Sequence, residues 1–232
     1  MAKRIIVQAR GKGGPRYRVR RRAFRFEVKY PAKLSGEGTI ITLFNSSAHT
    51  APLAKVKYSD GTFYMPAFKG MTEGQKIIFQ GNEVKEGNIM ELGNIPVKTP
   101  VYNVESVPMD GGVFIKSAGS YGEVSKVIGD DVYVLLPSKK ERKFNKKSRA
   151  TIGIIAGDGR LDKPIIKAGK MYHMKKATGK LWPRTSAVKM NVIDHPFGSG
   201  RGKRIKQKVP KRNAPPGKRV GLVSAKRTGH IK

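Results

Sequence analysis

The apolar residues between positions 38 and 156 occur in short runs or alternate with polar residues, which is the pattern of β-strands. Glycine and proline separate these runs, and two of the separators, Ser59-Asp60-Gly61 and Gly129-Asp130-Asp131, are typical of hairpin turns. The predicted strands cover residues 39–44, 53–58, 62–65, 76–79, 89–92, 101–107, 113–117, 124–128, 132–136, 142–144 and 151–155.

Many short strands at regular spacing predict small β-barrels or a sandwich. The alternation weakens between residues 81 and 100, so we expect a boundary there and two barrels, over residues 30–85 and 88–160. Beyond residue 160 the periodicity fades. One short helix is expected over residues 161–170, and the rest of the chain is expected to be irregular.

The charge of the chain is concentrated in a few segments. The 232 residues include 48 Lys and Arg against 16 Asp and Glu, a formal net charge of +32. Residues 1–30 carry +10, residues 31–138 carry −2, and residues 139–195 and 196–232 carry +12 each. A charge of this size repels itself unless a polyanion neutralises it. The distribution therefore predicts a near-neutral folded body with basic extensions that bind a polyanion.

The chain has no cysteine, which excludes disulfide scaffolds, thiol catalysis and cysteine-liganded metal sites. The beginning of the sequence offers only a three-residue apolar run, Ile5-Ile6-Val7. No stretch approaches the ~18 apolar residues that a membrane span requires. We therefore expect a soluble intracellular protein without a membrane partner.

Sequence signatures of enzymes are missing. No GxGxxG, HExxH or GxSxG pattern occurs, and the glycine-rich tract 198–203 lacks the P-loop spacing. The adjacent Asp194 and His195 invite a general-base interpretation. However, Pro196 favours extended geometry in the residue before it and aspartate favours turns, so the segment is interpreted as a turn. We predict no catalytic residue, no metal site and no cofactor.

Basic residues interleaved with aromatic ones are the strongest functional signal. Residues 16–26 read RYRVRRRAFRF, and segments 170–176 and 179–184 repeat the theme. Arginine binds phosphate through two parallel hydrogen bonds, and both guanidinium groups and aromatic rings stack on unpaired bases. With the further basic stretches 139–149 and 201–227, the pattern favours nucleic-acid binding over a localisation signal or a solvated strand edge.

Two other classes of function account for less of the sequence. An RNA-modifying or RNA-cleaving enzyme would require clustered acid and base residues or a cofactor loop. A histone-like DNA-compacting protein would explain the charge but not the two predicted barrels. Trp182, the only tryptophan, fits a base-stacking residue and a core residue equally well.

Segment 190–200 reads MNVIDHPFGSG and closely resembles the MN-x-x-DHP-x-G-x-G stretch of the universal large-subunit ribosomal protein L-two family. The resemblance covers nearly the whole chain. The other matching segments are 93–96 (GNIP), 117–120 (SAGS), 136–138 (LPS) with 141–142 (ER), 148–153 (SRATIG), 212–217 (RNAPPG) and 226–229 (KRTG). Segments 212–217 and 226–229, together with Phe197, resemble the archaeal branch of the family.

The resemblance implies a mainly β protein with an OB-fold barrel followed by an SH3-like barrel and basic, largely irregular extensions. The implied domains are an N-terminal extension over residues 1–29, an OB-fold RNA-binding domain over 30–85, an SH3-like barrel over 88–160 and a C-terminal extension over 161–232. The distal part of the last segment is expected to be disordered without RNA, because it has too few apolar residues to offset the entropy of ordering.

The resemblance also implies a structural component of the large ribosomal subunit that has no chemistry of its own. Such a protein binds large-subunit rRNA and supports subunit assembly, subunit association and the architecture around the peptidyl transferase region. The expected partners are large-subunit rRNA, other ribosomal proteins and the small subunit, with no homo-oligomer. The expected location is the cytoplasm, in the ribosome.

The predicted rRNA-binding residues come from the basic and basic-aromatic segments and from the stretch around His195. They are Arg10, Lys12, Arg16, Tyr17, Arg18, Arg20, Arg21, Arg22, Arg142, Lys146, Lys147, Arg149, Lys170, Lys175, Lys176, Trp182, Arg184, Asn191, Asp194, His195, Gly198, Gly200, Arg201, Lys203, Arg204, Arg212 and Arg227.

Overall fold

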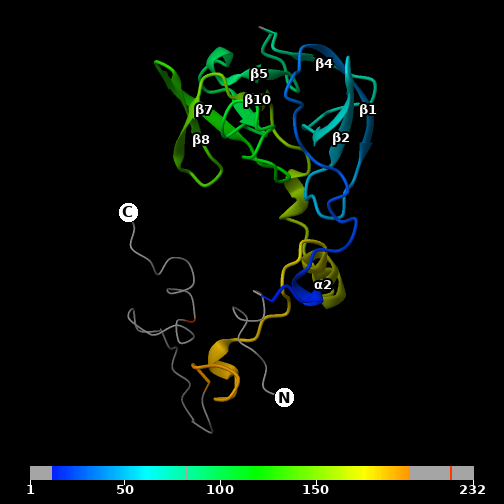
Figure 1. The fold of residues 1–232 in the computed structure, drawn as a ribbon, viewed down its shortest axis with the longest axis vertical. Helices are drawn as coiled ribbons and strands as arrows, with labels where there is room; N and C mark the ends of the chain where they lie inside the picture. Colours follow the sequence, from blue (N-terminus) through cyan, green and yellow to red (C-terminus); the bar gives the residue numbers. More distant parts are fainter. Residues whose placement is uncertain (1–11, 82, 199–219, 221–232) are drawn as a thin grey trace. The chain divides into compact units, whose positions relative to one another are not determined.

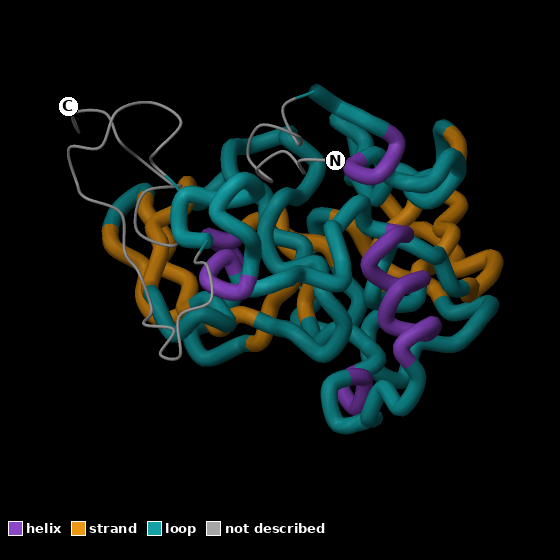
Figure 2. Tube along the Cα trace, turned by 90° about the horizontal axis from the view of Figure 1, so that it is seen from below, coloured by secondary structure: helices purple, strands orange, loops and turns teal. Residues whose placement is uncertain are grey.

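Strands and loops dominate the fold, and the helical segments in the described part of the chain are short (Figure 2). The computed structural model describes residues 12–81, 83–198 and 220. The chain divides into two units. The first unit is Arg21–Lys167, and the second unit is Met1–Arg20 with Ala168–Lys232. The mainly β fold predicted from the sequence is confirmed.

The unit Arg21–Lys167 contains a ten-stranded sheet (Figure 1). Its strand order is β3-β2-β1-β4-β5-β10-β6-β7-β8-β9. All neighbours are antiparallel except β4 and β5. The strands are β1 (Gly36–Phe44), β2 (Leu53–Tyr58), β3 (Gly61–Pro66), β4 (Lys76–Phe79), β5 (Ile89–Glu91), β6 (Pro100–Tyr102), β7 (Gly122–Ile128), β8 (Asp131–Leu135), β9 (Glu141–Asn145) and β10 (Arg149–Ile152).

Both hairpins predicted from the sequence are confirmed. Tyr58 pairs with Gly61 across a two-residue loop between β2 and β3. Ile128 likewise pairs with Asp131 between β7 and β8. In the second loop Gly129 has φ +60°, a conformation that glycine adopts without steric cost. Local turn chemistry thus sets these two strand pairings.

Two hydrophobic clusters lie in this unit, and the central strands contribute to both. In β5, Ile89 belongs to the first cluster and Met90 to the second. In β6, Val101 belongs to the second cluster and Tyr102 to the first. Successive side chains of a strand point to opposite faces, so one short strand packs on both sides. The first cluster includes Tyr102, Ala118 and Ile155, which come from the later part of the chain. The two clusters therefore do not divide at one point in the sequence. The barrel types and their boundaries stay predictions.

The strands expected over residues 101–107 and 113–117 differ most from the structure. The strand expected over residues 101–107 ends at Tyr102, and the one expected over 113–117 is reduced to a bridge between Val104 and Phe114. Asn103 has φ +49° and Ile115 has φ +56°. A residue in the left-handed region interrupts the extended backbone that a strand ladder needs. The alternation of apolar residues carries no information about these two angles.

The helix predicted over residues 161–170 is wrong in position, because α2 covers Ala168–Ala177. Pro164 would stand inside the predicted helix, where it removes a hydrogen bond and clashes with the preceding turn. At the other end Gly179, with φ +65°, donates its N–H to the Lys176 carbonyl at 3.2 Å, and Lys180 donates to the Lys175 carbonyl at 2.8 Å. This is a Schellman C-cap, which ends the helix. None of the helices that the structure describes is long and apolar enough to cross a membrane.

Candidate nucleic-acid interface

The basic N-terminal segment and α2 contact each other within the second unit, although they are far apart in sequence. Arg20 donates from Nη2 to Nδ1 of His173 at 2.8 Å, and Arg18 donates from Nε to the Gly13 carbonyl at 2.7 Å. At Gly179 an added Cβ would lie 3.0 Å from Cγ2 of Val19, so the segment runs closely past the C-terminal end of the helix. The fold thus brings together two basic segments that the sequence predicted separately.

Most predicted contact residues of this unit reach solvent. Ten Lys and Arg residues but only one acidic residue, Asp194, occur in its described ranges 12–20 and 168–198. A surface with this imbalance favours a polyanionic ligand. The exposed residues are Lys12, Arg16, Arg18, Arg20, Lys170, Arg184 and Asn191, and the half-buried ones are Tyr17, Lys175, Lys176, Trp182 and Asp194.

The turn predicted at residues 194–196 is confirmed. The N–H groups of Asp194 and His195 donate to the Asn191 carbonyl at 3.0 and 3.2 Å. Gly198 donates to the His195 carbonyl at 2.8 Å. The N–H of Phe197 donates to Nδ1 of His195 at 3.0 Å, and the two rings lie 5.2 Å apart. His195 therefore organises the backbone that follows it.

The hydrogen bond at Nδ1 fixes the state of the His195 ring. Because Nδ1 accepts a hydrogen bond from the Phe197 N–H, the ring is neutral and carries its own proton on Nε2. Desolvation by burial lowers the pKa of His195 from its usual value, which favours the same neutral form. A dyad in which Nδ1–H donates to a carboxylate is incompatible with this bond. In this state Nε2–H is the donor of the ring, and the residue as a whole is 9% exposed.

Gly198 is required by the turn itself. It is buried, and a Cβ added there would lie 2.7 Å from the backbone nitrogen of Val192 and would collide with the Asn191 carbonyl. Only glycine leaves room for this backbone crossing. A close approach of Gly198 to RNA stays a prediction.

Arg149 requires a correction, because the structure gives it a role inside the protein. Its side chain is 4% exposed and pairs with Glu105, whose side chain is 0% exposed. Nη2 and Nε of Arg149 donate to Oε1 of Glu105 at 2.6 and 3.1 Å. Nη1 donates to the carbonyls of Pro31 and Ala32 at 2.9 and 3.3 Å. Donors committed in this way are not offered to RNA, so Arg149 is removed from the candidate surface.

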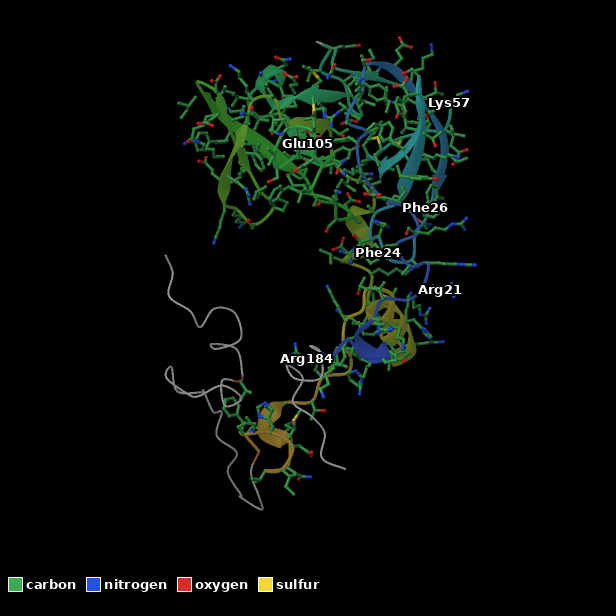
Figure 3. All side chains as sticks on the ribbon, in the orientation of Figure 1. Arg21, Phe24, Phe26, Lys57, Glu105 and Arg184 are labelled. Atoms are coloured by element: carbon green, nitrogen blue, oxygen red, sulfur yellow. The ribbon has the colours of Figure 1, made fainter. Side chains whose placement is uncertain are left out.

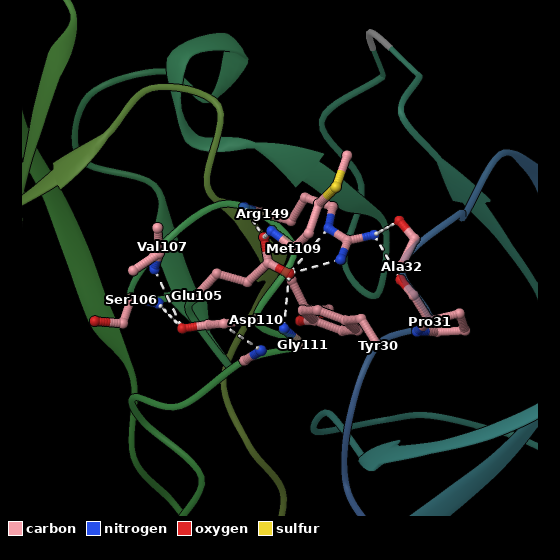
Figure 4. Close-up of polar contacts among 12 residues, drawn as sticks. Tyr30, Pro31, Ala32, Glu105, Ser106, Val107, Met109, Asp110, Gly111 and Arg149 are labelled. Carbon is pink, nitrogen blue, oxygen red and sulfur yellow. Dashed lines mark hydrogen bonds and ion pairs between the residues drawn. The ribbon is translucent and has the colours of Figure 1, made fainter.

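The Glu105 carboxylate also holds the loop that follows it (Figure 4). It accepts the N–H groups of Met109 at 3.2 Å, Gly111 at 3.0 Å and Arg149 at 2.8 Å. Several charge-assisted bonds to one carboxylate compensate the cost of burying it. The network ties the loop, β10 and the segment at Pro31 into one rigid part.

The other predicted residues of the first unit are exposed, with differing partners. Arg142 lies over the ring of Phe114, 4.2 Å from its centroid. Lys146 forms an ion pair with Asp130, whose pKa this contact lowers. For Arg21, Arg22 and Lys147, the described residues supply no acidic partner within ion-pair distance. The predicted residues Arg10, Gly200, Arg201, Lys203, Arg204, Arg212 and Arg227 lie outside the described residues, as does the predicted distal tail.

The outer face of β1–β2–β3 was not among the residues predicted from the sequence. Across this face Lys57 stands opposite Thr39 and Thr62. Lys55 stands opposite Thr42 and Tyr64. The alternation Lys55-Val56-Lys57 was the available signal, because it turns both lysines to the side opposite the buried Val56. We define the outer face by Thr39, Thr42, Lys55, Lys57, Thr62 and Tyr64.

The segment that enters the first unit adds aromatic and basic side chains next to the outer face. Phe26 packs on Phe44 and Tyr64, with ring centroids 4.5 and 5.0 Å apart. Phe24 contacts His49 edge to face at 5.3 Å and is 54% exposed. In Figure 3, the labelled Lys57, Phe26, Phe24 and Arg21 follow one another along one side of this unit. Within the described ranges, no His, Asp and Glu residues group closely enough to hold a metal ion.

Comparison with known proteins identifies the family. A family model described as "Ribosomal Proteins L2, C-terminal domain" matches residues 85–216. The chain is 43% identical to the large ribosomal subunit protein uL2 of Archaeoglobus fulgidus over 236 residues, which cover 99% of both chains. This chain belongs to the uL2 family. The uL2 proteins of Methanococcoides burtonii and Methanocaldococcus jannaschii are 42% and 40% identical, again over 99% of both chains.

The uL2 similarity spans both units. The family model includes α2, the turn at His195 and the Glu105–Arg149 pair, whereas the outer face of β1–β2–β3 precedes residue 85. The uL2 relatives cover that face as well, because their alignments take in 99% of this chain. The resemblance noted from the sequence motifs is therefore confirmed.

Proposed function

We propose that this protein is a structural component of the large ribosomal subunit and binds large-subunit rRNA. The observation that carries the proposal is the full-length similarity to large ribosomal subunit proteins uL2, at 40–43% identity. Unbalanced cations in the second unit support it, because phosphate neutralisation supplies most of the affinity of such surfaces. The proposal contains no catalytic step, and the protein acts in the cytoplasm, within the ribosome.

The proposed rRNA contacts are the solvent-facing cations of both units together with Tyr17, Trp182 and Asn191. His195 and Gly198 shape the turn that presents this segment, and Nε2–H of His195 donates to a phosphate or a 2′-OH. Charge and the family resemblance also support rRNA contacts by residues nearer the two ends of the chain. These are Arg10, Gly200, Arg201, Lys203, Arg204, Arg212 and Arg227.

The finer architecture and partners belong to the same proposal. The first hydrophobic cluster corresponds to an OB-fold barrel over residues 30–85 and the second to an SH3-like barrel over residues 88–160. Ile89 of β5 and Tyr102 of β6 pack in the first cluster, which supports two barrels that share central strands. The resemblance to the family is the ground for three further parts of the proposal. The protein contacts other ribosomal proteins, supports subunit assembly and association, and borders the peptidyl transferase region.

The test is association with large subunits and its salt dependence. Tagged protein should co-sediment with large subunits after a moderate-salt wash. On a large-subunit rRNA fragment, the slope of log affinity against log salt should reach about −6 for ~8 phosphates, at about 0.7–0.9 for each phosphate. Duplex DNA of equal length should compete poorly. Protein that stays at the top of the gradient, or a nearly flat salt titration, would contradict the proposal.

A further inference from the structure

Phe24 and Phe26 stand two residues apart in the same basic segment, and the structure gives them different environments. Phe26 is half-buried, and its ring contacts two neighbouring rings, Phe44 and Tyr64. Phe24 has one ring contact among the described residues, the edge-to-face contact with His49, and is 54% exposed. Phe26 therefore anchors the segment to the sheet, whereas Phe24 projects from it.

The contact with His49 leaves part of the Phe24 ring open. The two ring planes meet at 84°. In such an arrangement one ring turns its edge to the other, so His49 covers at most one face of Phe24. His49 is itself held by a 2.9 Å hydrogen bond between its Nδ1 and Oγ of Ser46. The exposed ring is thus supported from one side and available on the other.

The charges near this ring favour a polyanion. Arg21, Arg22 and Arg25 are exposed in the same segment, and Lys55 and Lys57 continue the positive charge along the outer face. The structure gives these five side chains no ion pair with a described acidic residue. By contrast, Lys126, Lys143 and Lys146 on the β7–β8–β9 side are all paired with Asp or Glu.

We propose that Phe24 stacks on one unpaired base of bound RNA, while Arg21, Arg25, Lys55 and Lys57 bind the phosphates beside it. An exposed ring among unpaired cations suits single-stranded RNA, because every base has a face that stacks on an aromatic ring. A protein partner would suit a more apolar patch with fewer cations. This inference rests on the proposed function, since it names where and how the RNA is held.

The test measures binding of full-length protein to a 12-nucleotide oligouridine and to a 12-base-pair RNA duplex. Phe24→Ala should weaken oligouridine binding by about 5- to 100-fold, the loss expected for one base stack, and change duplex binding less than about 2-fold. Phe24→Trp should retain or improve oligouridine binding. The double variant Lys55→Ala/Lys57→Ala should bind both oligouridine and the duplex more weakly. It should also reduce the magnitude of the slope of log affinity against log salt.

Two control variants separate stacking from folding and from general aromatic exposure. Tyr121→Ala removes a ring that is 45% exposed elsewhere in the unit, and it should leave oligouridine binding unchanged. Phe26→Ala should lower the thermal midpoint, whereas Phe24→Ala should not. If wild-type protein binds the rRNA fragment but Phe24→Ala binds oligouridine as tightly as wild type, the stacking site is wrong and the proposed function stands. If wild-type protein binds no rRNA, the proposed function itself fails.

Discussion

Single side chains decide much of the behaviour of this protein, and His195 is the clearest case. Its Nδ1 accepts the Phe197 N–H, and burial lowers its pKa. In the unfolded chain the ring protonates near the ordinary pKa of roughly 6.5. As pH falls below that value the unfolded state binds more protons than the folded turn, so the turn loses stability.

An NMR titration tests this account of His195. The His195 ring should titrate with a midpoint below roughly 6.5, and the Phe197 amide should shift with the same midpoint. In His195→Asn the amide oxygen Oδ1 is bonded to Cγ, as Nδ1 is in histidine, and it can accept the Phe197 N–H. This variant should preserve the turn, and because asparagine does not ionise the Phe197 amide should no longer shift with pH. His195→Gln carries its amide one bond further out and should hold the turn less well. A ring that titrates at or above the ordinary value would contradict the hydrogen bond at Nδ1.

Glu105 and Arg149 form the second residue-scale determinant. Glu105→Gln leaves the buried guanidinium without its counter-charge, which should lower the free energy of unfolding by about 3–5 kcal/mol. Glu37→Gln is the matched control, because Glu37 pairs with Lys76 at 3.4 Å with both side chains more than half exposed. An exposed pair contributes about 0.2–1 kcal/mol at most. Urea denaturation of both variants measures the difference, and equal effects would refute a structural role for the buried pair.

At the scale of elements, strand packing depends on positions where no side chain fits. Gly38 in β1 faces the ring of Phe79 from β4, and an added Cβ would lie 2.8 Å from Cε2 of that ring. Gly38→Ala should destabilise the protein by about 1–3 kcal/mol, since Phe79 is buried and has little room to move. Gly159→Ala is the control, because no atom lies within 4 Å of its added Cβ. Similar thermal midpoints for the two variants would contradict this packing argument.

Elements also differ in how far the sequence predicts them. Strands β2 and β4 begin and end where alternation and turn residues indicate. The helix expected over residues 161–170 is misplaced, because Pro164 disfavours a helix there, and Gly179 marks the end of α2. The strand expected over residues 113–117 is absent for another reason, since Ile115 has φ +56° and the residue pattern does not indicate this angle.

At the scale of the whole molecule, the predicted folded body should fold without the extensions on either side of it. The structure moves the start of this part to residue 21, because Ala23, Val28 and Tyr30 are buried. The Tyr30 hydroxyl hydrogen-bonds Thr151, and Cζ of Arg149 lies 5.6 Å from the centroid of the Tyr30 ring. A fragment of residues 21–167 should therefore unfold cooperatively.

Calorimetry of two fragments tests this expectation. The fragment 31–167 lacks Val28 and Tyr30, so it should unfold at a lower temperature than 21–167 or lose cooperativity. If both fragments have the same midpoint, the segment before residue 31 does not belong to the core. If 21–167 shows no cooperative transition, the folded unit depends on the extensions.

Local physics explains what the sequence determined by itself. Period-two alternation and turn residues act over a few positions, so they specified the β class, both hairpins and the turn at His195. The distribution of charge identified a near-neutral body with basic extensions, and the motif around His195 identified the family. None of these properties needs a contact between distant residues.

The tertiary structure alone decided which charged and aromatic residues face solvent. Arg149 lies in a basic stretch, yet it is buried because Glu105, 44 residues away, neutralises it. Phe24 and Phe26 share one motif, and only the packing of Phe44 and Tyr64 on Phe26 separates the anchor from the exposed ring. Burial depends on partners that are distant in the chain, and a residue's own type and neighbours do not encode them.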